Sequence, residues 1–376
     1  MKKLVIDTTS LKKAMQLASR VINKSSVLPA LDCFSCYTSI YNGRAYLHIN
    51  STDLENSISA CIPCEAKEKF RFLLHSDELN FIEKADEQPL TILYNDKTSE
   101  VSIQSETETV SCGGDNKVRD YPLLPNFPRN ELVQLENDFF SEIKTSLKFV
   151  ESNKNFGKQT YQGVLIETSD NSVTICATDA HILRTTKLNA IPAIETKFTM
   201  NPAFCKLISS FKKAENIHLS TMKSDTDTYT ILEMEINNMK VTITGKNFDC
   251  EPLNFRRVIP HGYKTCITLD KQDLQKRLEK AMLYTNRVTY QGIFSINGQV
   301  VLTAKDEDFK KSYKTVFPTN SKLGEDIDIA FNLSLLKRLL METKSEIVTL
   351  EMNKSNQAAI IKDGDTIMLI MPLQLN

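Results

Sequence analysis

Apolar and polar positions follow two periods along the chain, one typical of amphipathic helices and one typical of strands. An apolar stripe over 10–18 repeats every three or four residues, at Leu11, Ala14, Met15 and Ala18. Similar stripes predict helices over 139–150 and 272–284, and further helices that begin near Ser76, Asn201 and Asn332. The segments between them alternate apolar and polar residues, which predicts strands.

The sequence contains an internal repeat. Thr-Tyr-Gln-Gly at 160–163 returns at 289–292, and each copy leads through a hairpin turn into a strand that ends in an aspartate. The turns are Asp170-Asn171 and Asn297-Gly298, and the first third has an equivalent turn at Asn42-Gly43. The three strands end at Asp53, Asp179 and Asp306, spaced by 126 and 127 residues in a chain of 376.

The pattern in each third therefore predicts the order β-α-β-β-β twice, so we expect the chain to consist of three copies of one α+β module. We expect domains at 1–128, 129–260 and 261–376. Two stretches with prolines, 121–128 and 258–262, fit linkers because proline cannot continue a helix or a central strand.

Charge excludes a strongly basic surface. The chain has 46 Lys and Arg against 47 Asp and Glu, and a net charge of −1. The predicted helices nevertheless carry more basic than acidic residues. Two interpretations stay open: solvated helix faces, or helices that face a polyanion and bind phosphates weakly and with strong salt dependence.

Nucleotide-binding, export and membrane signals are missing from the sequence. The two Gly-Lys pairs, Gly157-Lys158 and Gly245-Lys246, lack the upstream glycine of a P-loop, and no G-x-G-x-x-G is present. No apolar run approaches the roughly 20 residues of a membrane span, and no signal peptide precedes the first helix. We expect a cytoplasmic protein with no membrane contact.

Cysteine and histidine residues offer weak enzyme candidates. Cys33 and Cys36, with Cys61 and Cys64, form two C-x-x-C pairs, but a strand would point the members of a pair to opposite faces. His181 lies two residues after Asp179 and could be an oriented base or a metal ligand. The repeat counterparts of Asp179 lack such a histidine, so a turn or capping role is the preferred interpretation.

Several motifs together resemble a known family. They are Leu28-Pro29-Ala30-Leu31, Ser51-Thr52-Asp53-Leu54-Glu55, Thr178-Asp179-Ala180-His181-Ile182-Leu183, Phe255-Arg256-Arg257-Val258-Ile259-Pro260 and Met371-Pro372-Leu373-Gln374-Leu375. In order and spacing, the whole chain is similar to the bacterial DNA polymerase III beta subunits, the sliding clamps.

The resemblance implies a non-catalytic processivity factor of DNA replication without a cofactor or bound metal. It would be a head-to-tail homodimer that closes as a ring around double-stranded DNA of any sequence, with helices lining the hole and sheets outside. Its expected partners are the replicative polymerase, the clamp loader, and repair polymerases and ligases that carry clamp-binding peptides.

The same resemblance places three sets of site residues. The partner-peptide groove falls on Lys158, Tyr161, Thr178, Ala180, Ile182, Leu183, Pro252, Arg257, Val258, Leu369, Ile370, Met371, Pro372, Leu373 and Leu375. The DNA-facing set, from a family match at Lys24 and from helix positions elsewhere, is Lys12, Lys13, Arg20, Lys24, Lys206, Lys212, Lys213, Lys276, Arg277, Lys280, Lys337 and Arg338. The dimer contact falls on Val110, Cys112, Leu283 and Tyr284.

The chain departs from the family pattern at the groove, where Ala180 and Ile182 stand in place of the usual glycine and arginine. One extra residue lies between Pro252 and Phe255, and Asn376 extends the usual end. Two alternatives stay open: a monomeric clamp-fold protein that binds peptides or nucleic acid, and a zinc or thiol enzyme.

Overall fold

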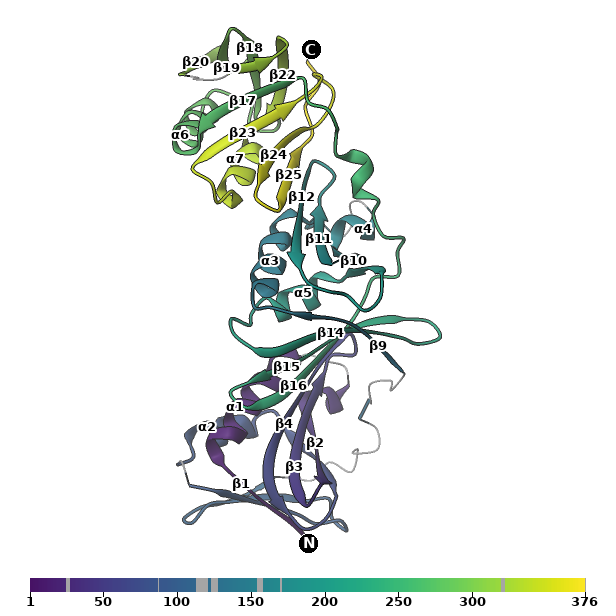
Figure 1. Ribbon diagram of the computed structural model, residues 1–376. Helices are drawn as coiled ribbons and strands as arrows, with labels where there is room; N and C mark the ends of the chain where they lie inside the picture. The colour runs from purple at the N-terminus through teal and green to yellow at the C-terminus, as the bar shows by residue number, and fades with distance from the viewer. Residues whose placement is uncertain are drawn as a thin grey trace. The chain divides into compact units, whose positions relative to one another are not determined.

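The computed structural model describes residues 1–24, 28–86, 88–112, 121–122, 128–153, 158–169, 171–318 and 322–375 (Figure 1). Within these ranges the order β-α-β-β-β occurs six times, twice in each third of the chain. This is the arrangement that the periodicity predicts.

The elements are as follows. The first third contains β1 (Lys2–Ile6), α1 (Thr8–Ala18), β2 (Cys33–Tyr41), β3 (Arg44–Thr52), β4 (Asn56–Ala66), β5 (Arg71–His75), α2 (Glu78–Lys84), β6 (Leu90–Tyr94), β7 (Val101–Gln104) and β8 (Thr109–Cys112). The second contains β9 (Arg129–Leu135), α3 (Asp138–Ser146), α4 (Gln159–Gln162), β10 (Val164–Ser169), β11 (Ser172–Thr178), β12 (Ile182–Asn189), β13 (Thr196–Met200), α5 (Pro202–Ile208), β14 (Glu215–Lys223), β15 (Thr228–Ile236) and β16 (Met239–Lys246). The third contains η5 (Phe255–Val258), a 3₁₀ turn, then β17 (Thr265–Asp270), α6 (Lys271–Met282), β18 (Gln291–Asn297), β19 (Gln299–Asp306), β20 (Lys311–Phe317), β21 (Lys322–Gly324), β22 (Ile327–Asn332), α7 (Leu333–Glu342), β23 (Ile347–Met352), β24 (Ala359–Asp363) and β25 (Thr366–Ile370).

Side-chain caps set the starts of three of the helices. Asp7 accepts a hydrogen bond from the backbone N–H of Ser10 at the start of α1, and Asp270 does the same for Asp273 at the start of α6. The side chain of Asn332 accepts two backbone N–H groups at the start of α7. The six predicted helices are confirmed, although α3 ends at Ser146 and a 3₁₀ turn continues it to Phe149.

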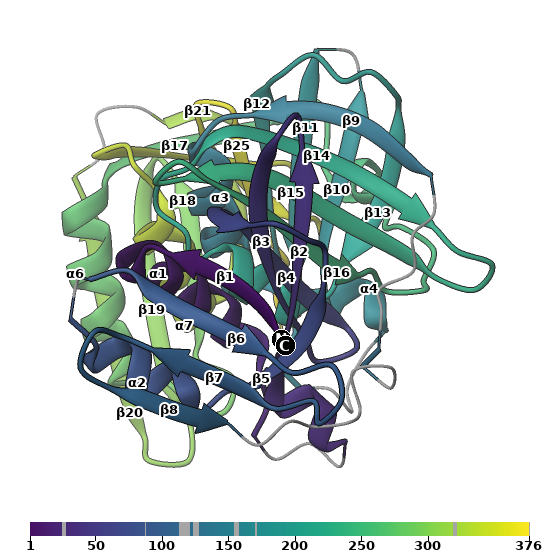
Figure 2. The ribbon, with the colours of Figure 1, turned by 90° about the horizontal axis from the view of Figure 1, so that it is seen from below.

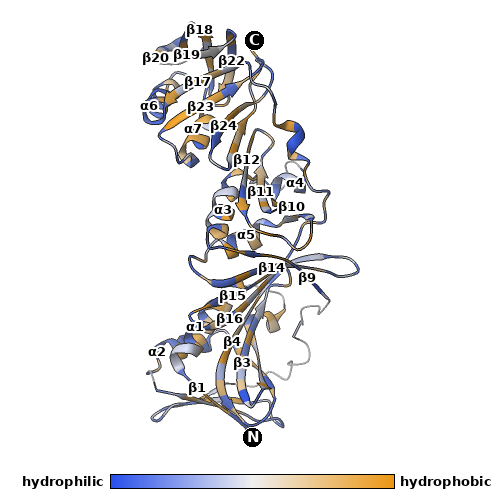
Figure 3. Ribbon diagram, in the orientation of Figure 1, coloured by the Kyte–Doolittle hydropathy of each residue, from blue (hydrophilic) through white to orange (hydrophobic). Residues whose placement is uncertain are grey.

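Two compact units divide the described chain. Unit 1 comprises 1–141, 190–194 and 203–249, and unit 2 comprises 142–189, 195–202 and 250–376. Unit 1 has one antiparallel sheet in the order β8-β7-β6-β1-β4-β16-β15-β14-β9, from which β3, β2 and β5 branch at β4 (Figure 2). Along β3, buried residues alternate with half-buried ones, and Ala45, Leu47 and Ile49 are the buried members. Figure 3 shows the hydropathy of each position along the ribbon.

Unit 2 has a nine-stranded sheet in the order β13-β10-β11-β12-β25-β24-β23-β17-β21, and a four-stranded sheet in the order β20-β19-β18-β22. Its main core is formed by apolar residues of α6, α7 and both sheets, among them Leu278, Leu336 and Phe294. Gly292 on β18 is required by packing, because an added Cβ would lie 2.5 Å from the side chain of Leu333.

The repeated aspartates organise turns. The Oδ1 atom of Asp53 accepts a hydrogen bond from the backbone N–H of Asn56 at 2.6 Å, and Asp179 accepts that of Ile182 at 2.8 Å. Asp306 accepts the backbone N–H of Phe309 at 3.3 Å. The predicted turn role is confirmed, whereas Asp170 of the predicted Asp170-Asn171 turn lies outside the described residues.

The proposed domain boundaries at 128/129 and 260/261 stay a prediction. Residues 123–127 of the first predicted linker lie outside the described part of the chain, as do Gly157 and Asn376. None of the described helices is both long enough and apolar enough to span a membrane.

Candidate partner groove, DNA-facing helices and dimer edges

The nine-stranded sheet of unit 2 buries a different set of residues on each face. Ala177, Ile182 and Ile370 belong to the main core with α6 and α7. The neighbouring positions Leu183 and Leu369 point the other way, because side chains alternate along a strand, and they are register partners. On that second face they form an apolar cluster with Leu165, Cys176, Phe255 and Ala358, against which Leu253 and Ile259 pack.

The turn between β11 and β12 lies next to this cluster. The hydroxyl of Thr178 donates to the backbone C=O of Ile182 at 2.6 Å and accepts the backbone N–H of Ala180 at 3.0 Å. Ala180 has φ of +74°, a left-handed conformation that costs an L-residue roughly 1–2 kcal/mol and glycine nothing. Ala180 is exposed, so its methyl group is part of the surface.

The C-terminal tail is held by main-chain hydrogen bonds. Met371 N–H donates to the backbone C=O of His181 at 2.8 Å, and Leu373 N–H donates to that of Ala330 at 2.8 Å. With Ser355 and Asn356, residues 371–375 line an open cavity of about 430 Å³. Met371 and Leu375 are each 40% exposed, so the tail offers apolar side chains to a ligand.

An ion-pair cluster holds the connecting segment 250–260 against the sheet. Glu167 on β10 is buried and receives Arg256 at 2.5 Å and Lys197 at 2.8 Å. Burial pushes the pKa of Glu167 upward, but the hydrogen bonds from Lys197 and Arg256 outweigh it and leave the pKa below its ordinary value of 4.5. Arg256 also stacks over Phe255, which holds that ring in the apolar cluster.

The remaining predicted groove residues differ in how deeply they are buried and in which face of the sheet they occupy. Ile182 and Ile370 are fully buried on the opposite face of the sheet, so they reach the groove through their backbone alone. Pro252 and Tyr161 are half-buried, while Lys158, Arg257 and Val258 are exposed. Among the described residues these five do not line the cavity at the C-terminal tail.

Several predicted DNA-facing cations of unit 1 already have partners. Lys24 forms an ion pair with Asp77 at 2.9 Å, and Lys12 donates to the backbone C=O of Glu83 at 2.8 Å. Arg20 donates to Ser210 at 2.8 Å and stacks over Phe211. In contrast, four exposed lysines have no ion pair within the described part of the chain: Lys13, Lys206, Lys212 and Lys213.

Unit 2 shows the same division. Arg277 is paired with Asp273 at 2.8 Å, Lys337 with Glu279 at 2.8 Å, and Arg338 with Asp179 at 3.6 Å. Lys276 and Lys280 on α6 are exposed and form no ion pair among the residues that the structure describes. These two side chains are therefore available to an anionic ligand.

The predicted dimer residues lie at free edges. Val110 and Cys112 are on β8, which pairs with β7 on one side and ends the sheet of unit 1. In unit 2, β20 ends the four-stranded sheet, and Leu283 after α6 is 75% exposed. Tyr284 stacks on Tyr313 of β20, with ring centroids 5.7 Å apart. An open cavity of about 690 Å³ beside Leu283 is lined by further exposed apolar residues, Val288 and Phe309.

Known proteins share this chain's sequence pattern and fold. Residues 256–374 match a family model described as DNA polymerase III beta subunit, C-terminal domain. The Beta sliding clamp of Chlamydia muridarum is 23% identical over 385 residues, which is 100% of this chain and 99% of the relative. Along its whole length the chain is similar to DNA polymerase III beta subunits.

Solved beta subunits have the same fold over the full length of the chain. A putative DNA polymerase III beta subunit from Eubacterium rectale superimposes with a TM-score of 0.80 at 20% identity, and 100% of each chain is covered. A sliding clamp from Pseudomonas aeruginosa, solved with griselimycin bound, gives a TM-score of 0.78 at 16% identity with the same coverage. These likenesses show the fold.

Sequence reasoning missed several members of the apolar cluster, namely Leu165, Cys176, Leu253, Phe255, Ile259 and Ala358. The period of two along β10, β11 and β12 was the available signal, because it separates Leu183 from Ile182. No local pattern predicts that segment 250–260 packs on this face, because its position depends on the contact between Arg256 and Glu167.

The cysteine pairs lie on strands. Cys33 and Cys36 are on β2, and Cys61 and Cys64 are on β4, with β3 between the two strands. Burial raises the pKa of the Cys36 thiol, and it raises that of Cys64 to about 11, so both stay protonated near neutral pH. Within the described ranges, no three His, Cys, Asp or Glu side chains are grouped to hold a metal ion.

Proposed function

We propose that two copies of this chain close head to tail into a ring that encircles double-stranded DNA and tethers the replicative polymerase to it. The observation that carries the proposal is the sixfold β-α-β-β-β order combined with cations on the helices and free sheet edges in both units. The processivity function of the family supports it. Such a protein needs no catalytic group.

The proposed contact with DNA is weak and independent of sequence. Single lysines on short helices, such as Lys13 and Lys206, can neutralise phosphates without placing a helix in a groove. A closed ring remains on DNA by topology, so the contact itself need not be tight. The paired cations, such as Lys24 with Asp77, would reduce the number of phosphates engaged at one time.

Ring closure is proposed to join β8 of one copy to β20 of the next, with Leu283 and Tyr284 beside the new strand pair. Two different free edges that meet in this way form a heterologous contact, which closes when the rotation allows it. A mass near twice the 42.6 kDa of one chain, measured by small-angle X-ray scattering in moderate salt, is the expected result. A monomer at micromolar concentration would contradict ring closure.

A pair of variants sharpens this test. Leu283→Asp places a charge on a side chain that is 75% exposed in the single chain, and it should shift the protein to the monomer. Ile191→Asp places the same charge on another exposed aliphatic side chain and should leave the mass unchanged. Equal behaviour of the two variants would exclude Leu283 from the contact.

The apolar cluster and the C-terminal tail are proposed to bind a short peptide from each partner. The partners are the polymerase, the clamp loader, and repair polymerases and ligases with clamp-binding peptides. Met371→Ala combined with Leu373→Ala should abolish stimulation of the polymerase while the dimer mass is kept. Loss of the dimer in this variant would instead assign the tail a structural role.

Three domains at 1–128, 129–260 and 261–376 remain part of the proposal, as does a cytoplasmic location, where the chromosomal DNA of a bacterium is replicated. The alternative of a monomeric clamp-fold binding protein is separated by the mass measurement. The zinc or thiol enzyme is separated by metal analysis of the purified protein, since the proposal predicts no stoichiometric zinc.

A further inference from the structure

The sheet of unit 1 is forked at β4. Residues Asn56–Cys61 of β4 pair with β16, whereas Glu65 and Ala66 pair with β1. Between these two sections, residues 62–64 have β3 as a neighbour on one side and no paired strand on the other, within the described chain. Pro63 suits this place, because a proline cannot donate a hydrogen bond to a ladder.

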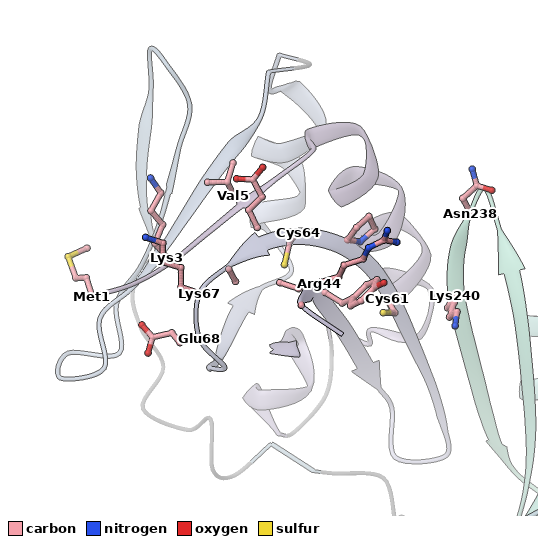
Figure 4. A pocket seen from close by; sticks show the side chains of 16 residues that line it. Met1, Lys3, Val5, Arg44, Cys61, Cys64, Lys67, Glu68, Asn238 and Lys240 are labelled. Carbon is pink, nitrogen blue, oxygen red and sulfur yellow. The ribbon is translucent and has the colours of Figure 1, made fainter. Parts of the chain in front are cut away.

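A concave surface lies over the fork. It has a volume of about 1060 Å³ and is lined by β1 and β4 on one side, by the start of β3, and by the β15–β16 hairpin on the other (Figure 4). Tyr46 and Val5 are half-buried parts of this surface. The volume is at the upper end for a small-molecule site, and the surface is open, so a segment of polypeptide fits it better than a compact ligand.

Four cations surround the concave surface. Lys3, Arg44, Lys67 and Lys240 are all exposed, and none forms an ion pair within the described part of the chain. They come from β1, β3, β16 and the residue that follows β4, so the fold collects them from separate parts of the sequence. Two carboxylates, Glu65 and Glu68, also line the surface, which leaves an excess of positive charge in a chain whose net charge is −1.

We propose that this concave surface docks an acidic peptide segment of a partner protein in an extended conformation. The cations match its carboxylates, and the surface is open and large enough for an extended segment. The site lies wholly in unit 1, whereas the groove at Leu183 and Met371 lies in unit 2. The two sites can therefore be tested separately.

Single-stranded nucleic acid fits the surface less well. Tyr46 is the one aromatic side chain among the lining residues, whereas nucleic-acid platforms stack successive bases on several rings. Glu65 and Glu68 would also repel a continuous line of phosphates, but they can face the gaps between the acidic side chains of a peptide.

The test is a fluorescence anisotropy titration of the full chain with a fluorescein-labelled decapeptide of alternating aspartate and valine. The wild type should bind this probe, and Lys3→Glu with Lys240→Glu should weaken binding about tenfold or more. Lys187→Glu with Lys223→Glu is the matched control, because both lysines are exposed on other strands and the change in net charge is the same. The control should bind like the wild type.

Two further arms locate the probe. Met371→Ala with Leu373→Ala should bind the decapeptide unchanged, and the probe should slow amide hydrogen exchange in 62–66 but not in 369–373. No binding by the wild type, equal weakening in the control, or sensitivity to the Met371 variant would each overturn the proposal. Tighter binding of a ten-nucleotide single strand, with the same dependence on Lys3 and Lys240, would assign the surface to nucleic acid instead.

Discussion

The ion pair between Arg184 on β12 and Glu142 on α3 makes an asymmetric prediction about stability. Arg184 is 2% exposed and Glu142 8%, and a second hydrogen bond links Arg184 to Ser146 at 3.3 Å. Glu142 has another partner in Lys344 at 3.6 Å, but Arg184 has no second carboxylate within the described residues. Loss of Glu142 should therefore destabilise the protein more than loss of Arg184.

Glu142→Leu leaves a buried guanidinium with no carboxylate partner among the described residues, and it should reduce the free energy of local opening at β12 by about 3–5 kcal/mol. Arg184→Met leaves a carboxylate that keeps Lys344 as an ion-pair partner, so we expect a smaller loss of about 2 kcal/mol. The double variant removes both charges and should lie within about 1 kcal/mol of the wild type, because a buried pair often contributes little over an apolar replacement.

Native-state hydrogen exchange of the β12 amides measures this free energy locally, which avoids treating the two units as one unfolding step. The double variant serves as the control for packing. A cost of Arg184→Met above that of Glu142→Leu would refute the reasoning, as would a double variant whose cost equals the sum of the two single changes.

Three further predictions concern the groove and the DNA contact. Glu167→Gln should reduce the free energy of unfolding by about 1–2 kcal/mol at pH 7. The difference from the wild type should shrink as pH falls below 4.5, because a carboxylate with a lowered pKa stabilises the fold only while it is ionised. Urea unfolding at a series of pH values measures this difference. Ala180→Gly should raise stability by about 0.5–1 kcal/mol in a thermal melt, and a decrease would contradict strain at φ +74°. Lys206→Gln with Lys213→Gln should reduce the salt dependence of duplex binding by about one to two charges in anisotropy titrations, equally for unrelated sequences.

The fold was predictable because its signals are local. The helix over 10–18 has its apolar stripe within two turns, and the turns at Asp53, Asp179 and Asp306 repeat at constant spacing. Each of these features needs only neighbouring residues. The expected β-α-β-β-β order follows from them.

The groove was only partly predictable because it depends on which face a strand residue takes. Ile182 and Leu183 are equally apolar, and the period of two places them on opposite faces; the packing of α6, α7 and Phe255 decides which face is the core and which is the groove. Arg184 lies on the core face although it is charged. Its partner Glu142 is 42 residues away in the sequence, so no local pattern predicts the pair. The fork at β4 depends on pairing between β4 and β16, which no local pattern reports.

Topological retention on DNA tests the proposed ring most directly. The protein would be incubated at high concentration with a nicked circular plasmid, passed through a sizing column in 0.5 M salt, and compared before and after the plasmid is cut. We predict that the protein stays with the circle in high salt and is released when the DNA becomes linear. Equal retention on circular and linear DNA, or binding that the salt removes from both, would contradict encirclement.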